Sequence, residues 1–362
     1  MKKAIRLVVL NKIKIAYLIT AFSFFVSCKK EKIGPQYNLD GALAGYTINI
    51  LNEGSFGNSN ASITQYNPIT KETAQGVFQS KNGNTLGDVL QSANYHDGKN
   101  YLVINNSGKI VIVDSVTFSF ESEITGFNSP RYITFYKNKA FVSDLYAKGI
   151  YVVNIETNQI TGFIPTTGWT ERMVIYNDQL FVLDLGVREP PSYLNQGNNK
   201  LYKIDPNTNA KLDSVITPLE PNGLVLDQNN KLWMLCSGAV DNQETPRLIR
   251  VDPTTLSIEK QLLFNQLEMS PTNLTLGSDG LSLLYINQGV FEFSINDSQL
   301  PSVPLISSSE TIYGLGVDML RNEIYVTFSP SFTTNGTCKR YYANGNVIDE
   351  FSTGIGPSFI QF

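Results

Sequence analysis

Polar side chains that could hold a ligand recur at one position of a repeated segment. Five of them share a register near the start of successive strand-like stretches: Arg131, Arg172, Asn222, Asn273 and Tyr313. Residues in one register of a repeat converge on one ring, and two arginines there could bind a carboxylate or a phosphate through paired hydrogen bonds. The same arginines could instead be paired internally with Glu171 or Asp144, and the sequence leaves both alternatives open.

Four loops of the repeat are longer than a turn requires, and such loops tend to carry function. They span residues 52–61, 184–200, 236–247 and 328–337 and are rich in Asn, Gln, Tyr, Phe and Ser. This composition suits an uncharged or mixed polar ligand held by amide hydrogen bonds and aromatic contacts, with Trp169 as one aromatic platform. The residues predicted to bind the ligand are Asn52, Glu53, Phe56, Asn105, Arg131, Tyr146, Trp169, Arg172, Arg188, Tyr193, Asn222 and Tyr313.

Residue types that are scarce argue against several kinds of active site. His96 is the only histidine, which speaks against a Ser-His-Asp triad and against a metal site built on several histidines. Neither GxxxxGK[ST] nor GxGxxG, the phosphate-binding loops, occurs in the chain. An acid–base pair would have to be Glu53 with Asp88 or Asp184. We therefore predict a protein without catalytic residues, metal or cofactor.

The elements that must position these residues form a repeat. Each copy has two strand-like stretches rich in Val, Ile, Tyr and Phe. A turn then places Asp or Asn three residues before Thr, where the short side chain can accept hydrogen bonds from the backbone. Five copies of this turn are visible: Asn67 to Thr70, Asp114 to Thr117, Asn154 to Thr157, Asp205 to Thr208, and Asp252 to Thr255.

A further opening strand precedes each copy, and it sets the period. From Pro130 the steps to Glu171, Pro221, Pro271 and Ile312 are 41, 50, 50 and 41 residues. Periods of about 40–50 residues with several short strands per unit are typical of propeller blades. No window shows the 3.6-residue period of a helix, and a two-sheet sandwich is the alternative that fits next best.

The two ends of the repeat indicate the number of blades. Residues 356–362 (GPSFIQF) form one more opening strand, 45 residues after Ile312, and the first unit lacks one. A C-terminal strand that completes the first blade closes the ring and leaves no exposed sheet edge. The sequence therefore predicts an all-β fold, a seven-bladed β-propeller closed in this way.

The first 45 residues have a different character. Five cations accompany an apolar run over residues 15–26, which leads into Ser27 and Cys28. A basic region before an apolar run of about 7–15 residues is typical of a signal peptide, and a small residue before a cysteine resembles a lipobox. We predict a lipoprotein signal peptide over residues 1–27, a lipidated Cys28 with a linker over residues 28–45, and the propeller over residues 46–362.

Charge and cysteine content narrow the partners. Removal of residues 1–27 takes away the five cations and no acid, which changes the formal net charge from −4 to −9. Such a chain is a poor partner for nucleic acid, because binding phosphates requires Lys and Arg. Cys236 and Cys338 either pair in an oxidising envelope or stay buried as free thiols.

The strand pattern and its Asp/Asn-to-Thr turns resemble the YVTN/YncE-like propellers over most of residues 46–362. Asn52-Glu53-Gly54, with Gly57 and Asn60-Ala61, resembles a group of Bacteroidota envelope lipoproteins that includes the surface cobalamin-binding BtuG group. The motifs over residues 86–89 (LGDV) and 355–359 (IGPSF) fit the same group. This resemblance implies capture of a corrinoid and its transfer to a TonB-dependent transporter.

These observations lead to one expected function and two alternatives. We expect a non-enzymatic outer-membrane lipoprotein, on the cell surface or the periplasmic face, that touches the membrane only through its lipid anchor. It would bind a small molecule, with vitamin B12 as the first candidate, and pass it to an outer-membrane transporter. The alternatives are a protein-interaction platform at the envelope and a propeller lyase or hydrolase.

Overall fold

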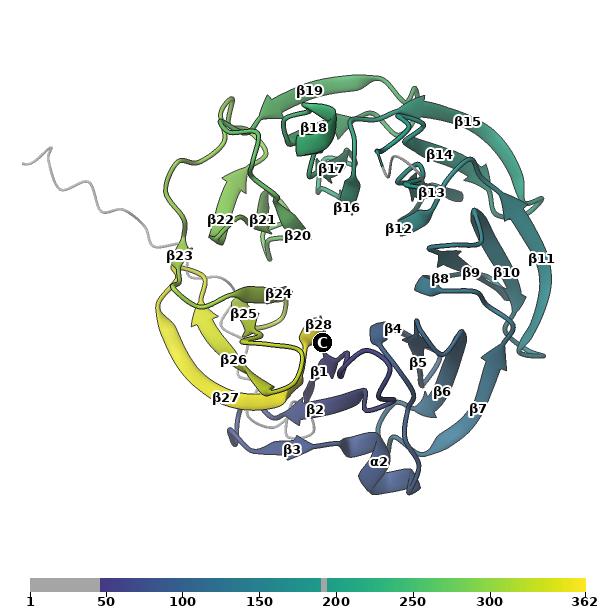
Figure 1. The fold of residues 1–362 in the computed structure, drawn as a ribbon, viewed down its shortest axis with the longest axis vertical. Coiled ribbons are helices and arrows are strands. Elements are labelled where there is room, and N and C mark those ends of the chain that lie inside the picture. Colours follow the sequence, from purple (N-terminus) through teal and green to yellow (C-terminus); the bar gives the residue numbers. More distant parts are fainter. Residues whose placement is uncertain (1–45, 190–193) are drawn as a thin grey trace, which may run out of the picture. The chain divides into compact units, whose positions relative to one another are not determined.

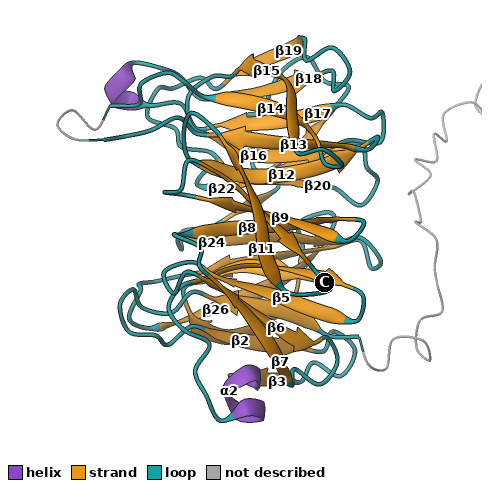
Figure 2. Cartoon of the chain, turned by 90° about the vertical axis from the view of Figure 1, so that its right-hand side faces the viewer, coloured by secondary structure: helices purple, strands orange, loops and turns teal. Residues whose placement is uncertain are grey.

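The structure is a computed structural model and describes residues 46–189 and 194–362. These residues form seven four-stranded antiparallel sheets, which stand side by side around a common axis (Figures 1 and 2). The predicted seven-bladed β-propeller is thereby confirmed. The signal peptide, Cys28 and the linker predicted over residues 1–45 lie outside the described residues.

The inner strand of each blade is the opening strand that the repeat predicts, and it lies nearest the axis (Figure 1). It is paired on one side only, to the second strand of its own sheet. From blade 1 to blade 7 the inner strands are β28 (Pro357–Gln361), β4 (Leu90–His96), β8 (Pro130–Tyr136), β12 (Thr170–Tyr176), β16 (Pro221–Leu226), β20 (Thr272–Leu276) and β24 (Ile312–Asp318).

The second strands are continuous apolar runs because neighbouring blades cover both of their faces. Residues 232–236 (LWMLC) and 323–328 (EIYVTF) are buried at every position. Cys236 and Cys338 lie in this core as free thiols, and burial raises the pKa of each. The second strands are β1 (Ile48–Asn52), β5 (Lys99–Ile104), β9 (Lys139–Asp144), β13 (Gln179–Asp184), β17 (Leu232–Cys236), β21 (Ser282–Ile286) and β25 (Glu323–Phe328).

Polarity increases toward the rim, where the outermost strands meet solvent. The seven residues 210–216 (AKLDSVI) are almost all exposed. The third strands are β2 (Ser62–Tyr66), β6 (Lys109–Asp114), β10 (Gly149–Asn154), β14 (Lys200–Asp205), β18 (Arg247–Val251), β22 (Gly289–Ser294) and β26 (Asn335–Tyr342). The outer strands are β3 (Thr73–Gln75), β7 (Phe120–Thr125), β11 (Gln159–Pro165), β15 (Ala210–Ile216), β19 (Ile258–Leu263), β23 (Ile306–Ser307) and β27 (Val347–Ile355).

The repeated Asp/Asn-to-Thr turns join the third strand of a blade to the fourth. Hydrogen bonds from the turn to the Asp or Asn side chain stabilise them. In blade 2, Asp114 Oδ1 accepts hydrogen bonds from the backbone N–H of Thr117 at 2.7 Å and from its Oγ1 at 2.8 Å. In blade 5, Asp252 Oδ1 accepts from the backbone N–H of Thr254 at 2.8 Å and of Thr255 at 2.9 Å. The carboxylate replaces the backbone acceptor that a tight turn lacks, which explains the recurrence of this residue pair.

The C-terminal strand closes the ring. β28 pairs with β1 in antiparallel register, with Ile50 opposite Ile360 and Leu51 opposite Phe359. Thr327 of blade 7 also donates a hydrogen bond from Oγ1 to the carbonyl of Pro357. The first and last parts of the chain are therefore held in one sheet, as the sequence repeat predicts.

A buried ion cluster ties blade 7 to blade 1 farther from the axis. Arg340 in β26 is only 4% exposed, and its guanidinium meets both oxygens of Glu323 at 2.8 Å. Its Nη1 donates to Asp349 Oδ2 at 3.2 Å and to the carbonyl of Pro68 in blade 1 at 3.0 Å. Tyr66, also in blade 1, donates its hydroxyl to the same Asp349 oxygen at 2.9 Å.

Within the described residues, helical structure is confined to two short segments, α2 (Val77–Asn82) and the 3₁₀ turn η1 (Val240–Asn242). At six residues α2 is too short to leave a helical period in the sequence, and it lies at the outer edge of the ring beside β3 (Figure 1). Asn82 anchors it to blade 2, because its Nδ2 donates to the Phe118 carbonyl at 2.9 Å. Among the described residues no helix is long and apolar enough to cross a membrane.

Candidate functional site

All seven inner strands bulge immediately after their first paired residue. In blade 5, Pro221 pairs with Cys236 and Gly223 with Leu235, so Asn222 has no partner across the sheet. Bulges often re-aim a side chain next to a functional site. The equivalent residues of blades 1 to 7, which we call the bulge ring, are Ser358, Gln91, Arg131, Glu171, Asn222, Asn273 and Tyr313.

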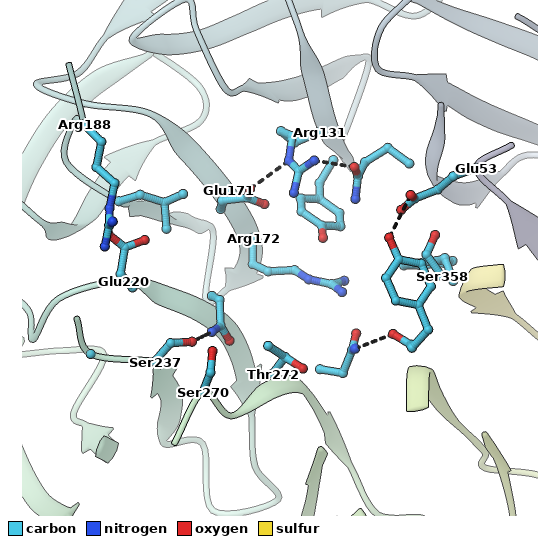
Figure 3. A pocket seen from close by; sticks show the side chains of 18 residues that line it. Glu53, Arg131, Glu171, Arg172, Arg188, Glu220, Ser237, Ser270, Thr272 and Ser358 are labelled. Carbon is cyan, nitrogen blue, oxygen red and sulfur yellow. Dashed lines mark hydrogen bonds and ion pairs between the residues drawn. The ribbon is translucent and has the colours of Figure 1, made fainter. Parts of the chain in front are cut away.

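Every member of the bulge ring lines one cavity at the propeller axis, which we call the axial cavity (Figure 3). Its volume is about 440 Å³, within the range of pockets that hold small ligands. Other residues of the inner strands, the long loops and the loops that enter the inner strands contribute the rest of its wall. These other lining residues are Glu53, Tyr132, Arg172, Leu185, Arg188, Glu220, Ser237, Gly238, Ser270, Thr272 and Phe359.

Arg131 is held by neighbours in the bulge ring. Its Nε donates to Glu171 Oε1 at 2.7 Å, and its Nη1 donates to Gln91 Oε1. Three adjacent blades are joined by this chain of contacts, in which the Glu171 carboxylate is buried. Of the two alternatives for this arginine, the structure shows internal pairing with Glu171.

Arg172 does not occupy the register that the sequence repeat predicts for it. Thr170 pairs with Asp184 as Pro130 pairs with Asp144. Glu171 is therefore the equivalent of Arg131, and Arg172 lies one position later. The step of 41 residues in the sequence aligns Pro130 with Glu171. The strand pairing aligns Pro130 with Thr170 instead, because the loops between blades differ in length.

The Arg172 side chain extends into the axial cavity between Arg131 and Ser358 (Figure 3). Its guanidinium carbon lies 4.1 Å from the centre of the Tyr132 ring and 5.6 Å from that of Phe359. Within residues 46–189 and 194–362, no carboxylate lies within 4.0 Å of this guanidinium and no acceptor takes a hydrogen bond from it. Arg172 is thus stacked on an aromatic face while its N–H donors stay unused.

Arg188 and Glu220 form a second ion pair at the cavity wall, with 2.8 Å between Arg188 Nε and Glu220 Oε1. Asn195 Nδ2 donates to the same glutamate oxygen at 2.7 Å. Asn222 is oriented by hydrogen bonds from its Nδ2 to the Ser237 hydroxyl and to the Pro271 carbonyl, the latter 3.0 Å long. Its Oδ1 is buried and has no partner in the described part of the chain.

Glu53 is the third carboxylate of the cavity, and Tyr313 donates its hydroxyl to Glu53 Oε2 at 2.8 Å. Burial raises the pKa of Glu53 above its usual value, and this hydrogen bond and the charge of Arg131 offset part of the increase. Burial and the nearby Glu53 also raise the pKa of Tyr313, so this phenol is neutral near pH 7. Glu53 therefore accepts a hydrogen bond rather than forming an ion pair.

Six of the predicted ligand residues line the axial cavity and five do not. The cavity brings together Glu53, Arg131, Arg172, Arg188, Asn222 and Tyr313. Two predicted residues instead stabilise the fold: Asn52 Nδ2 donates to Thr64 Oγ1 at 3.1 Å, and Asn105 Nδ2 donates to Ser129 Oγ at 2.9 Å. Tyr193 lies outside the described residues.

The remaining predicted residues are aromatic and lie on loops outside the cavity wall. Phe56 is 74% exposed on the loop between β1 and β2. Tyr146 and Trp169 contact each other edge to face, with 5.5 Å between ring centres. These loops lie at the same ends of the blades as the bulge ring, so the aromatic rings belong to the face on which the cavity opens.

The acidic residues considered for an enzyme do not meet in the cavity. Asp184 accepts hydrogen bonds from the backbone N–H of Gly168 at 2.9 Å and of Gly186 at 2.8 Å. Asp88 accepts from the backbone N–H of Gly57 at 2.8 Å. Both stabilise loops, and neither lines the cavity that Glu53 lines. His96 stacks on Phe135 with 4.3 Å between ring centres and also lies outside the cavity wall.

Several lining residues were missed in the sequence analysis. Gln91 lies 40 residues before Arg131, so the repeat itself would have identified it once the irregular first copy was aligned. Ser358 and Phe359 of the closing strand are the equivalents of Arg131 and Tyr132. Glu220 left no such signal, because it precedes its strand in a loop whose conformation the repeat does not set.

The two arginines of the cavity are expected to differ in their contribution to stability. Arg131→Met should lower the free energy of unfolding by about 2–4 kcal/mol, because it leaves the buried Glu171 carboxylate unpaired. Arg172→Met should lower it by at most about 1 kcal/mol, since only the stacking on Tyr132 is lost. Urea unfolding of both variants measures the difference, and equal losses would contradict the assignment of Arg172 as the unpaired arginine.

Glu53 is expected to make stability depend on pH. A raised pKa means that the folded chain holds the proton more tightly than the unfolded chain, so ionisation disfavours the folded state. Protonated Glu53 makes its full contribution to the free energy of unfolding below the usual glutamate pKa. This contribution is lost as pH rises through the raised pKa of Glu53. Glu53→Gln cannot ionise, and its stability relative to wild type should therefore increase from about pH 4 to about pH 8. A difference that stays constant over this range would refute the environment described for Glu53.

Comparison with known sequences places most of the chain in one family. The sequence profile of the family described as Domain of unknown function (DUF5074) matches residues 46–353. Comparison with curated proteins gave no match. The matched range covers the propeller except for the last two residues of β27 and the closing strand β28.

Comparison with solved structures identifies several propellers. A crystal structure titled quinonprotein alcohol dehydrogenase-like protein, from Bacteroides thetaiotaomicron, has a TM-score of 0.69 at 18% identity and covers 88% of this chain and 78% of its own. Hydrazine synthase of Kuenenia stuttgartiensis matches with a TM-score of 0.55 at 14% identity, over 72% of this chain and 85% of its own. Apo AztD of Citrobacter koseri matches with a TM-score of 0.54 at 11% identity, over 87% and 96%. At these identities the likeness shows the fold alone.

Proposed function

The chain belongs to the DUF5074 family, and from that premise we propose that it is a non-enzymatic lipoprotein of the cell envelope that binds a small molecule in the axial cavity. The observation that carries the proposal is the bulge ring. Each of the seven blades gives one polar side chain to the cavity, which structural closure of the ring does not require. A concave site with a few convergent polar groups is the usual form of a small-molecule site.

A corrinoid is the first ligand to test, on the ground of the Asn52-Glu53-Gly54 resemblance. A corrin ring with its amide side chains is larger than the axial cavity of about 440 Å³. It would therefore rest on the loop face, near Phe56 and Trp169, and place only a peripheral group in the cavity. In this proposal Cys28 carries the lipid anchor at the outer membrane, and a TonB-dependent transporter receives the ligand.

The experiment is a size-exclusion run of residues 33–362 with cyanocobalamin, followed at the absorbance of the corrin. Coelution at one corrinoid per chain is expected if the loop face and the cavity act together. The variant with Phe56→Ala and Trp169→Ala, which removes the exposed Phe56 ring and the half-buried Trp169 ring and spares the cavity wall, should then weaken binding. Complete separation of protein and chromophore would remove the corrinoid from consideration.

A protein-interaction platform is the second candidate, and the exposed aromatic residues favour it. Phe56 and Phe332 are 74% and 50% exposed on neighbouring loops, which are joined by a hydrogen bond from Ser55 Oγ to the Phe332 carbonyl. Exposed apolar groups that cluster often mark contact surfaces. A partner that binds the wild type without any added ligand, and fails to bind a Phe56→Ser, Phe332→Ser variant, would support this alternative.

A further inference from the structure

We infer that Arg172 forms an anion subsite in the axial cavity and that the ligand presents a carboxylate or phosphate to it, next to hydroxyl groups. The inference rests on the proposed function, since it names the chemical class of the small molecule. Nothing in the fold requires a cation at this position. None of the equivalent residues in the other six blades carries a charge: they are Phe359, Ser92, Tyr132, Gly223, Leu274 and Gly314.

The axial cavity contains three arginines and three glutamates. Glu171 is taken by Arg131, at 2.7 Å, and Glu220 is taken by Arg188, at 2.8 Å. Glu53 accepts the Tyr313 hydroxyl and lies more than 4.0 Å from any cationic nitrogen of the described chain. Among the described residues, Arg172 is therefore the one arginine of the cavity without a counter-charge.

Arg172 presents its guanidinium to the axial cavity. The contact at 4.1 Å with the Tyr132 ring holds the guanidinium against an aromatic face, and no acceptor of the described chain takes a hydrogen bond from its N–H groups. An arginine in this state matches the two oxygens of a carboxylate or a phosphate. Because stacking already restricts the side chain, less conformational entropy is lost when an anion binds.

Polar side chains other than Arg172 also line the axial cavity. Ser270 and Thr272 bring hydroxyls to the wall, whereas the Ser237 hydroxyl already donates to the Pro271 carbonyl at 2.9 Å, and the buried Asn222 Oδ1 lacks a donor in the described part of the chain. A buried acceptor without a partner is costly unless a ligand supplies one. Ligand hydroxyls would satisfy these groups, so a sugar acid or a sugar phosphate is the chemistry that the cavity fits.

The experiment measures thermal unfolding of the full chain in detergent with glucuronate, glucose or inorganic phosphate at equal ionic strength. Glucuronate and glucose share the hydroxyl groups on carbons 1 to 4 and differ at carbon 6, where glucuronate carries an anionic carboxylate in place of a hydroxymethyl group. We expect glucuronate to raise Tm more than glucose does. Arg172→Met should weaken glucuronate binding about tenfold or more, and Arg172→Lys should restore part of it. Arg247→Met, which removes an arginine outside the cavity, should bind as the wild type does.

Each outcome decides the inference. Equal shifts with glucose and glucuronate, a glucuronate shift unchanged in Arg172→Met, or no shift with either anion would overturn the anion subsite. A phosphate shift as large as the glucuronate shift, and lost in Arg172→Met, supports the subsite and overturns the part assigned to hydroxyls. Cyanocobalamin or another neutral ligand that binds wild type and Arg172→Met alike overturns the inference but leaves the proposed function standing.

Discussion

Removal of residues 357–362 is expected to prevent the chain from reaching its native fold. The deletion takes away the inner strand of blade 1, leaves β1 unpaired on the side nearest the axis, and exposes Ile48 and Ile50. It also removes the contact of Thr327 with the Pro357 carbonyl, which links blade 7 to blade 1. A loss of this size is comparable with the whole stability of a domain, about 5–15 kcal/mol.

The two buried thiols make the result easy to read in a chain that starts at residue 33. Cys236 and Cys338 are both fully buried, so a thiol reagent reacts slowly with the wild type under native conditions. In the truncated chain both thiols should react at once, and addition of a synthetic peptide of residues 354–362 should slow the reaction again. A truncated chain with protected thiols and an unchanged Tm would show that the ring does not depend on its closing strand.

Arg340→Met is expected to lower the free energy of unfolding by about 2–4 kcal/mol, because the buried Glu323 carboxylate loses its two-oxygen contact with Arg340 and keeps only Arg321, at 3.1 Å. Glu323 is buried and meets the guanidinium through both oxygens, each at 2.8 Å. The same substitution removes the contact to Asp349 within blade 7 and the contact to the Pro68 carbonyl, which holds blade 7 against blade 1. Urea unfolding followed by fluorescence measures the change.

Two further variants separate the buried pair from the loss of an arginine as such. In Arg340→Met, Glu323→Gln the buried carboxylate that lost Arg340 is gone as well, so about half or more of the lost stability should return. Arg250→Met breaks a pair with Glu259 in which both side chains are more than one quarter exposed, and it should cost about 1 kcal/mol or less. A loss below about 1 kcal/mol in Arg340→Met would contradict the role of the buried cluster in ring closure.

The fold was accessible from the sequence because its determinants are local. Asp114 and Thr117 fix a turn through hydrogen bonds within a few residues, and the same pair recurs in other blades. The closing strand was predicted from residues 356–362 by the same logic, since a lone opening strand at the end of the chain needs a sheet to join.

The candidate site was accessible only in part, because contacts between blades decide what each side chain does. Arg131 and Arg172 look alike in the sequence, yet one is bound by Glu171 and the other is unpaired. The difference arises from a shift of one residue in register, which strand pairing reveals and spacing does not. Asn52 and Asn105 were predicted to bind ligand because amides in loops resemble binding groups, but both hold the backbone of neighbouring segments.

The central claim, that the axial cavity is a ligand site organised around Arg172, is tested most directly by a crystal structure of the chain soaked with glucuronate. We expect density for the sugar acid inside the bulge ring, with its carboxylate at hydrogen-bonding distance from the Arg172 guanidinium and a hydroxyl near Asn222 Oδ1. Density for glucuronate only outside the cavity, or solvent alone in the cavity at saturating concentration, would contradict it.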